Sequence, residues 1–192
     1  ATQHGPALEL ALILASKATD EFFLPDGTYD RKKFGTHTHS TTCVMSSLAQ
    51  LADITSDISL LKRVKTFYDN GLWEIRDEIG WVIESSNDKS PPDRGECNNT
   101  GDIVETALII GKYGYPEYFQ DAERITRGHL LPAQLRDNSF IPETPNPSLK
   151  NGLHDLANRH LGAFGFPAPY GHRPKGLERI SFNMDIVGGS VA

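Results

Sequence analysis

The sequence is poor in the features that would identify a function at once. Only two of its 192 residues are cysteines, Cys43 and Cys97, which excludes a disulfide framework but leaves a single bridge or a pair of metal-binding thiolates open. It contains no Gly-rich phosphate loop, no Gly-x-Ser-x-Gly elbow and no Cys-x-x-Cys pair. Nucleotide-binding enzymes, the common serine hydrolases and zinc ribbons are therefore not indicated.

Positive charge and long apolar runs are also scarce. The formal net charge is −6, whereas binding to a phosphate backbone needs a basic face, so we do not expect a nucleic acid partner. The longest apolar run, residues 7–15, contains Glu9 and is shorter than the ~20 residues that span a bilayer, so we expect no membrane partner. No signal peptide is recognisable and the chain begins with Ala1. The cytoplasm, the periplasm and secretion therefore all stay open.

What the chain does contain is helical spacing of apolar residues, without the alternation that is typical of strands. The spacing predicts helices over residues 7–19, 40–54, 58–68, 101–113, 116–130 and 149–161. The first is apolar nearly all round, which predicts a buried inner helix. Asp57 and Thr100 are predicted N-caps, and Gly114 and Pro116 mark the break between two helices.

Short links and long polar loops alternate between these helices. The short links lie at residues 55–57 and 114–116, and the long loops at residues 22–40 and 80–97. Such alternation is typical of helical hairpins, with the short links at one end of the stack and the long loops at the other, where functional residues usually lie. We therefore predict an all-α fold of hairpins packed around a common axis.

Two histidines, His37 and His39, lie just before the second predicted helix. At this spacing an extended backbone points both imidazoles to the same side, which suits a metal or an anionic sugar. The alternative is structural: Thr38 or Ser40 caps the helix, and one imidazole packs as a hydrogen-bonded wall.

Trp81 is followed three residues later by Glu84, just past the end of a predicted helix. This pair suits a sugar-binding cleft, because an indole face packs on the C–H face of a sugar ring while a carboxylate binds hydroxyls or exchanges protons. The alternative is a core tryptophan beside a glutamate that faces solvent.

A polar stretch leads into the fourth predicted long helix and consists of Glu96, Cys97, Asn98 and Asn99. Glycoside hydrolysis needs two carboxyl groups that flank the scissile bond, so Glu96 and Asp102 join Glu84 as candidate catalytic residues. The two asparagines are candidate substrate-binding residues, as is Asp185 near the C-terminus. Alternatively, Asp102 belongs to the helix cap and Glu96 is merely exposed, while Cys97 is either a metal thiolate or a small buried side chain.

In this order the motifs resemble the six-hairpin glycosidases, in particular the β-L-arabinofuranosidase-like glycoside hydrolases. The resemblance covers about residues 34–136 and runs from the paired histidines through Gly80-Trp81-x-x-Glu84 to Glu96-Cys97. It implies an (α/α)6 toroid and zinc as a cofactor, held in that family by a Glu-x-Cys segment and a later Cys-Cys pair. Here Cys97 is the candidate ligand, the glutamate is displaced by one position, and no Cys-Cys pair follows.

The expected function is therefore hydrolysis of polysaccharide or oligosaccharide side chains, with a carbohydrate as the partner. Glu84 or Glu96 would be the general acid, Asp102 or Asp185 would steer water or substrate, and Trp81 would stack on the sugar. The two histidines would bind hydroxyls or a uronate.

A toroid of twelve helices needs well over about 300 residues. We therefore expect residues 1–192 to form one incomplete domain whose partner is the remainder of a longer chain. Two other classes stay open: a non-catalytic helical domain that binds glycans or proteins, and an α/α toroid polysaccharide lyase with His37, His39 or Tyr170 as the base.

Overall fold

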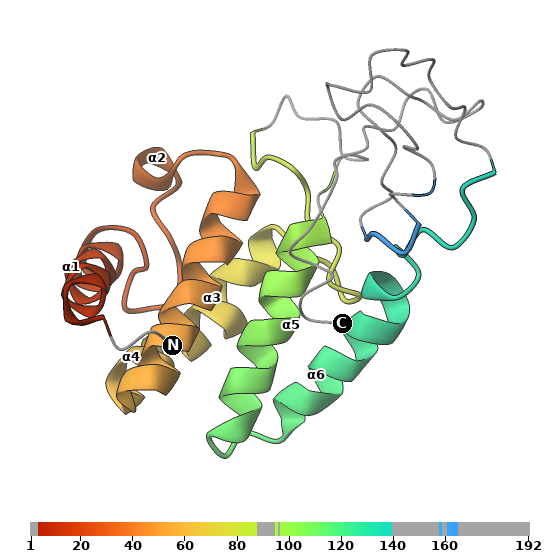
Figure 1. Ribbon diagram of the computed structural model, residues 1–192. Helices are drawn as coiled ribbons and strands as arrows, with labels where there is room; N and C mark the ends of the chain where they lie inside the picture. The colour runs from red at the N-terminus through yellow and green to blue at the C-terminus, as the bar shows by residue number, and fades with distance from the viewer. Residues whose placement is uncertain (1–3, 88–94, 96, 140–157, 159–160, 165–192) are drawn as a thin grey trace, which may run out of the picture.

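The computed structural model describes residues 4–87, 95, 97–139, 158 and 161–164 (Figure 1). This part of the chain is mainly helical, which confirms the all-α class. Its elements are α1 (Gly5–Glu21), α2 (Arg31–Phe34), α3 (Thr38–Thr55), α4 (Ile58–Asp69), the 3-10 turn η1 (Gly71–Glu74), α5 (Cys97–Lys112), α6 (Glu117–Ile125) and the π-helical turn η2 (Thr126–Leu130). None of the described helices is both long enough and apolar enough to cross a bilayer.

Helices α3 and α5 lie side by side, α4 packs on α3, and α6 packs on α5 (Figure 1). The predicted helices over 40–54, 58–68 and 101–113 correspond to α3, α4 and α5, and the helix predicted over 116–130 is divided into α6 and η2. The core between these helices consists of side chains that recur at helical spacing and are almost fully buried, among them Met45, Ala49, Ala52, Leu61, Val64, Ile103, Ala107 and Ile110.

The short links lie at one end of this stack, as predicted. Asp57 caps α4 by accepting a hydrogen bond from Leu60 N at 2.9 Å, and Gly114 follows α5 with a φ of 99°, which glycine adopts without strain. Asp53, near the end of α3, accepts a hydrogen bond at 2.7 Å from Lys112, at the end of α5. The starts of α3 and α5 therefore lie together at the opposite end, where the long loops are.

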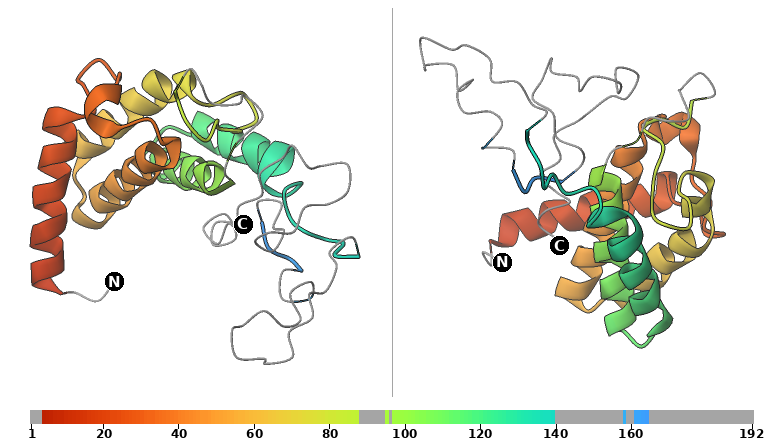
Figure 2. Two further views of the ribbon diagram at one scale, coloured as in Figure 1. Left: turned by 90° about the horizontal axis from the view of Figure 1, so that it is seen from above. Right: turned by 90° about the vertical axis from the view of Figure 1, so that its right-hand side faces the viewer.

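The prediction that the first helix is buried on all sides was wrong. Helix α1 lies at one edge of the stack (Figure 2), and its closest packing uses Ala15 and Ala18. Leu10 and Leu14 are each 56% exposed, and Ile13 is 66% exposed. An apolar sequence predicts that a helix forms and that it has apolar faces, but it does not say how many of those faces another element covers.

The predicted cap at Thr100 was wrong, and the last predicted helix is largely outside the described residues. Helix α5 begins at Cys97, so Thr100 lies inside its first turn rather than at its cap. The helix predicted over 149–161 falls outside the described residues except for Asn158 and Leu161.

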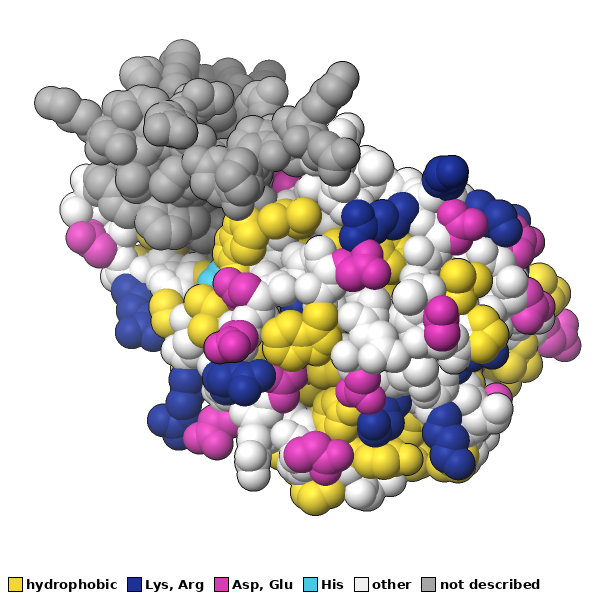
Figure 3. All heavy atoms as spheres, turned by 180° about the vertical axis from the view of Figure 1, so that it is seen from behind, with side chains coloured by type: hydrophobic (Ala, Val, Ile, Leu, Met, Phe, Trp, Pro, Cys, Tyr) yellow, Lys and Arg dark blue, Asp and Glu magenta, His cyan; other side chains and the backbone are white. Residues whose placement is uncertain are grey.

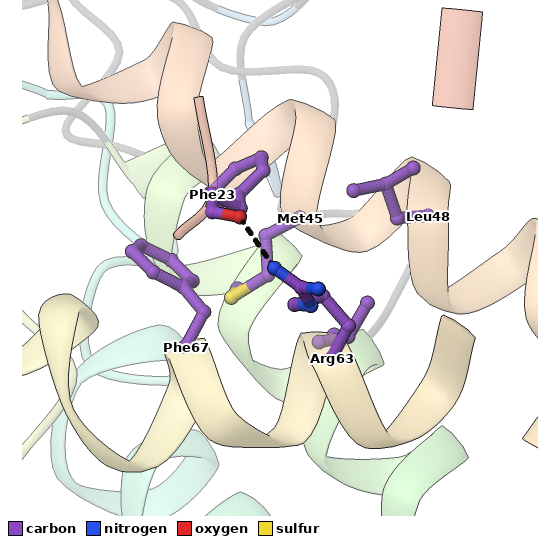
Figure 4. Close-up of a pocket in the computed structure, with 6 residues that line it drawn as sticks. Phe23, Met45, Leu48, Arg63 and Phe67 are labelled. Carbon is purple, nitrogen blue, oxygen red and sulfur yellow. Dashed lines mark hydrogen bonds between the residues drawn. The ribbon is translucent and has the colours of Figure 1, made fainter. Parts of the chain in front are cut away.

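Charged side chains of both signs are interspersed with apolar ones on the face shown in Figure 3. A small apolar depression between α3, α4 and the end of α1 is lined by Phe23, Met45, Leu48, Arg63, Val64 and Phe67 (Figure 4). Its charged group, Arg63, donates a hydrogen bond to the Phe23 carbonyl at 3.0 Å. The depression is part of the core packing and lies among residues that carry none of the predicted functional roles.

A buried ion pair fastens the loop after η1 to α6. The Arg76 side chain is fully buried and donates to Asp121 Oδ2 at 3.0 Å and to the Tyr68 hydroxyl at 3.2 Å. Its guanidinium also lies 4.0 Å from the centre of the Trp73 ring. A buried cation of this kind depends on its carboxylate partner, because removal of the partner leaves an uncompensated charge.

We therefore expect Asp121→Ala to lower the free energy of unfolding by about 3–5 kcal/mol, measured by urea denaturation. The matched control is Glu123→Ala, on the same helix as Asp121. It removes an exposed ion pair with Arg127 and should lower the free energy of unfolding by about 0.5 kcal/mol or less. Equal effects of the two substitutions would show that the buried pair does not stabilise this loop.

Candidate functional site

The long-loop end brings together three segments that carry predicted site residues. The loop after η1 lies against the start of α3: Thr38 N donates to Glu84 O at 3.1 Å, and Ser86 N donates to Thr36 O at 2.8 Å. A backbone bridge also pairs His37 with Ser85. These contacts place Glu84 beside the two histidines, although the residues are about 45 positions apart in sequence.

His39 connects the start of α3 to the start of α5. The amide nitrogen of Asn98 lies 3.2 Å from His39 Nδ1, and because an amide nitrogen only donates, Nδ1 is the acceptor. The other nitrogen, Nε2, lies 3.6 Å from Asp102 Oδ2. Both nitrogens of this imidazole therefore face side chains of α5, which favours the predicted packing of one imidazole as a wall. The cap predicted at Thr38 or Ser40 was wrong, because α3 begins at Thr38 and its N-cap is His37, without a side-chain cap.

The Thr42 hydroxyl lies one turn further along α3 and extends this network. It is 2.7 Å from Asn99 Oδ1 and 2.9 Å from Asp102 Oδ2. Asn99 and Thr42 are fully buried, and Asp102 is 4% exposed. The carboxylate of Asp102 therefore faces the helix interface, where it can orient His39 but has little access to a ligand.

The polar contacts continue along the two helices as a seam. Ser46 and Gln50 on α3 both donate to Glu105 on α5, Gln50 at 2.7 Å. Cys43 on α3 is an exposed residue, yet partial burial of its thiol raises the pKa of this group, and the carboxylates of Asp102 and Glu105 raise it further. We refer to Thr42, Ser46, Gln50, Asn99, Asp102 and Glu105 as the polar seam.

Sequence reasoning missed most of this seam, although a signal was present. Residues 39, 42, 46 and 50 recur at the spacing of one helix face, and so do residues 98, 102 and 105. Two polar stripes on helices that are predicted to pack indicate a buried hydrogen-bonded interface.

Trp81 and Glu84 are both half-buried, so each presents part of its side chain to solvent. The Trp81 ring packs on Gly95, where a Cβ atom would lie only 2.8 Å from Trp81 Nε1. A glycine at position 95 is therefore required for this close approach. His37 is exposed, and its ring centre lies 6.1 Å from that of His39.

His129, on η2, is a third imidazole at this end, and the sequence did not indicate it. Its Nδ1 lies 2.9 Å from Thr100 Oγ1, and this hydroxyl also donates to the Gly80 carbonyl at 2.9 Å. Burial lowers the pKa of His129 below its ordinary value, while the Gly80 carbonyl and the Asp77 carboxylate act in the opposite direction. Within the loop, Gly80 directly precedes Trp81.

Cys97 is buried and packs with Leu130 and Phe164, which is the predicted alternative to a metal thiolate. Among the residues that the structure describes, no three histidine, cysteine, aspartate or glutamate side chains are grouped closely enough to hold a metal ion. The remaining predicted residues, Glu96, Asp185 and the candidate lyase base Tyr170, lie outside the described residues.

The comparisons with known proteins identify no relative: no family model, no curated protein and no solved structure matches this chain. The class that the fold defines is therefore an all-α protein of packed helical hairpins.

The polar seam predicts a specific effect of Thr42 substitutions. Thr42→Val keeps the shape of the side chain but removes the hydroxyl whose hydrogen is donated to Asn99 Oδ1 or Asp102 Oδ2, and we expect a loss of about 1–3 kcal/mol in the free energy of unfolding. Thr42→Ser keeps the hydroxyl and removes one methyl group, so its cost should be smaller, about 1 kcal/mol. If urea denaturation shows a larger loss of unfolding free energy for Thr42→Ser than for Thr42→Val, the hydrogen-bonded role of Thr42 is contradicted.

The lowered pKa of His129 predicts how stability depends on pH. The unfolded chain takes up this proton near pH 6.5 and the folded chain only at lower pH, so acidification favours the unfolded state. The contribution of His129 is thus complete above about pH 6.5 and is lost as the pH falls toward the folded-state pKa. The free energy of unfolding, measured from pH 7.5 downward, should fall more steeply for the natural chain than for His129→Asn; parallel curves would contradict this.

Proposed function

We propose that the chain belongs to a glycoside hydrolase of the helical hairpin type, an (α/α)6 toroid, which acts on side chains of polysaccharides or oligosaccharides. The observation that carries this proposal is the position of Trp81 and Glu84. Both residues are partly exposed, and the backbone of Glu84 is bound to Thr38, next to the exposed His37. An aromatic face, a carboxylate and an imidazole are the groups that bind a sugar ring and exchange protons with its oxygens.

Within this proposal the two described carboxylates have different roles. Asp102 is buried in the polar seam and positions His39. Glu84 is accessible and is the candidate general acid. Glycosidases use a second carboxyl group, about 5–5.5 Å away in retaining enzymes and about 6.5–9.5 Å away in inverting ones, and Glu96 is the candidate for this second group.

A non-catalytic glycan-binding domain is the second candidate. The burial of Asp102 between α3 and α5 favours it, because Glu84 is then the one partly exposed carboxylate among the described candidates. A lyase with His39 as its base is less well supported, since both nitrogens of that ring face α5.

The test is a screen of the chain against aryl glycosides and branched plant-type polysaccharides, with detection of released sugar, of binding and of ultraviolet-absorbing products. We expect released sugar, and we expect Glu84→Gln to lower kcat/KM by about 100-fold or more, because a general acid contributes at least this factor. The control is Glu78→Gln, an exposed glutamate in the same loop, which should leave the activity unchanged.

The other outcomes separate the alternatives. Binding without released sugar would favour the glycan-binding domain, and ultraviolet-absorbing products would favour the lyase. If the chain neither binds nor cleaves any carbohydrate in the screen, the proposal is overturned.

A further inference from the structure

We propose that His129 is a ligand-binding residue of the candidate site, in which the Thr100 hydroxyl holds the ring proton on Nδ1 so that Nε2 accepts a hydrogen bond from a hydroxyl group of the bound sugar. The role toward a sugar rests on the function proposed above. The position of the ring proton does not, because it follows from the contacts of the protein alone.

The Thr100 hydroxyl has two hydrogen-bond partners. The side chain is fully buried in the first turn of α5, with Oγ1 2.9 Å from Gly80 O and 2.9 Å from His129 Nδ1. A carbonyl oxygen can only accept, so the single hydrogen of the hydroxyl points to Gly80. Thr100 Oγ1 therefore faces the imidazole as an acceptor, and Nδ1 must carry a proton.

The proton on Nδ1 determines what the other ring nitrogen can do. In a neutral imidazole with a proton on Nδ1, Nε2 holds a lone pair and accepts hydrogen bonds. The ring is half-buried, and its lowered pKa keeps it neutral near pH 7. The charged group that acts on it from the loop is Asp77, whose carboxylate already accepts hydrogen bonds from Ile79 N at 3.0 Å and Trp81 N at 2.9 Å.

The His129 ring is joined to the loop that carries Trp81. Thr100 contacts both His129 Nδ1 and the carbonyl of Gly80, and Gly80 directly precedes Trp81, the candidate stacking residue. His129 also lies on a π-helical turn, in which Leu131 N donates to Thr126 O at 2.9 Å. Turns of this kind insert one residue into a helix and re-aim the side chains that follow, and they are frequent at functional sites.

Nuclear magnetic resonance of the imidazole nitrogens tests the proton position without any ligand. At a pH above the pKa of His129, we expect the natural chain to show the tautomer with a proton on Nδ1. Thr100→Val keeps the shape of the side chain but removes the acceptor, so the population with a proton on Nε2 should rise. A natural chain with its proton on Nε2 would overturn the inference.

Kinetics with a sugar substrate from the screen test the binding role. His129→Asn keeps an N–H that can reach Thr100 but has no acceptor at the position of Nε2, and we expect KM to rise about 10-fold with little change in kcat. His129→Gln can place an oxygen at that position and should restore part of the loss. For the natural chain KM should also rise as the pH falls through the pKa of His129, whereas for His129→Gln it should not.

The outcomes separate this inference from the proposed function. An unchanged KM for a folded His129→Asn protein, as judged by urea denaturation, would overturn the role of His129 while the glycosidase proposal stands. A natural chain that neither binds nor cleaves any sugar would overturn both the proposed function and the sugar-binding role, whatever tautomer is observed.

Discussion

The pairing of α3 with α5 is the interaction on which the rest of the structure depends. Apolar faces alone allow two helices to slide by a turn at modest cost, because one leucine or alanine contact can replace another. Buried polar groups do not allow this, since each must find its partner. The Thr42 hydroxyl lies within hydrogen-bond distance of Asn99 Oδ1 and Asp102 Oδ2, and its single hydrogen can be donated to either oxygen. Both contacts exist in only one register, and that register aligns the starts of the two helices.

This alignment determines where the long loops lie. With the starts of α3 and α5 side by side, the loop after η1 is bound on two sides. Its Glu84 carbonyl accepts from Thr38 at the start of α3, and its Gly80 carbonyl accepts from Thr100 at the start of α5. The Arg76–Asp121 pair fastens the same loop to α6. Trp81 and Glu84 are therefore carried by a loop that three helices hold, rather than by one that is positioned by its own sequence.

Local signals in the sequence were sufficient for most of the helices. The cap at Asp57, the glycine at position 114 and the spacing of apolar residues depend on neighbours within a few positions, and all three predictions are confirmed. Thr100 satisfied the same local rule for a cap, yet it lies inside α5. Its hydroxyl binds Gly80 and His129, which are 20 and 29 residues away, and a local rule cannot predict such partners. His129 had no local signal at all. The exposure of Leu10 and Leu14 likewise depends on which elements pack against α1, and the sequence of α1 alone does not predict this packing.

The polar run at residues 98–102 shows how a helix divides neighbouring residues between different roles. Each residue turns the direction of its side chain by about 100°, so Asn98 and Asp102 share one face while Thr100 lies nearly opposite. The first face meets His39 on α3, and the opposite face meets His129 on η2. His39 has both ring nitrogens directed at α5, with Nδ1 3.2 Å from Asn98 Nδ2 and Nε2 3.6 Å from Asp102 Oδ2, so the ring lies between the two helices. His129 is held through Nδ1 by a hydroxyl that is itself committed to Gly80, and for this reason it is the imidazole of the two that retains an acceptor for a ligand.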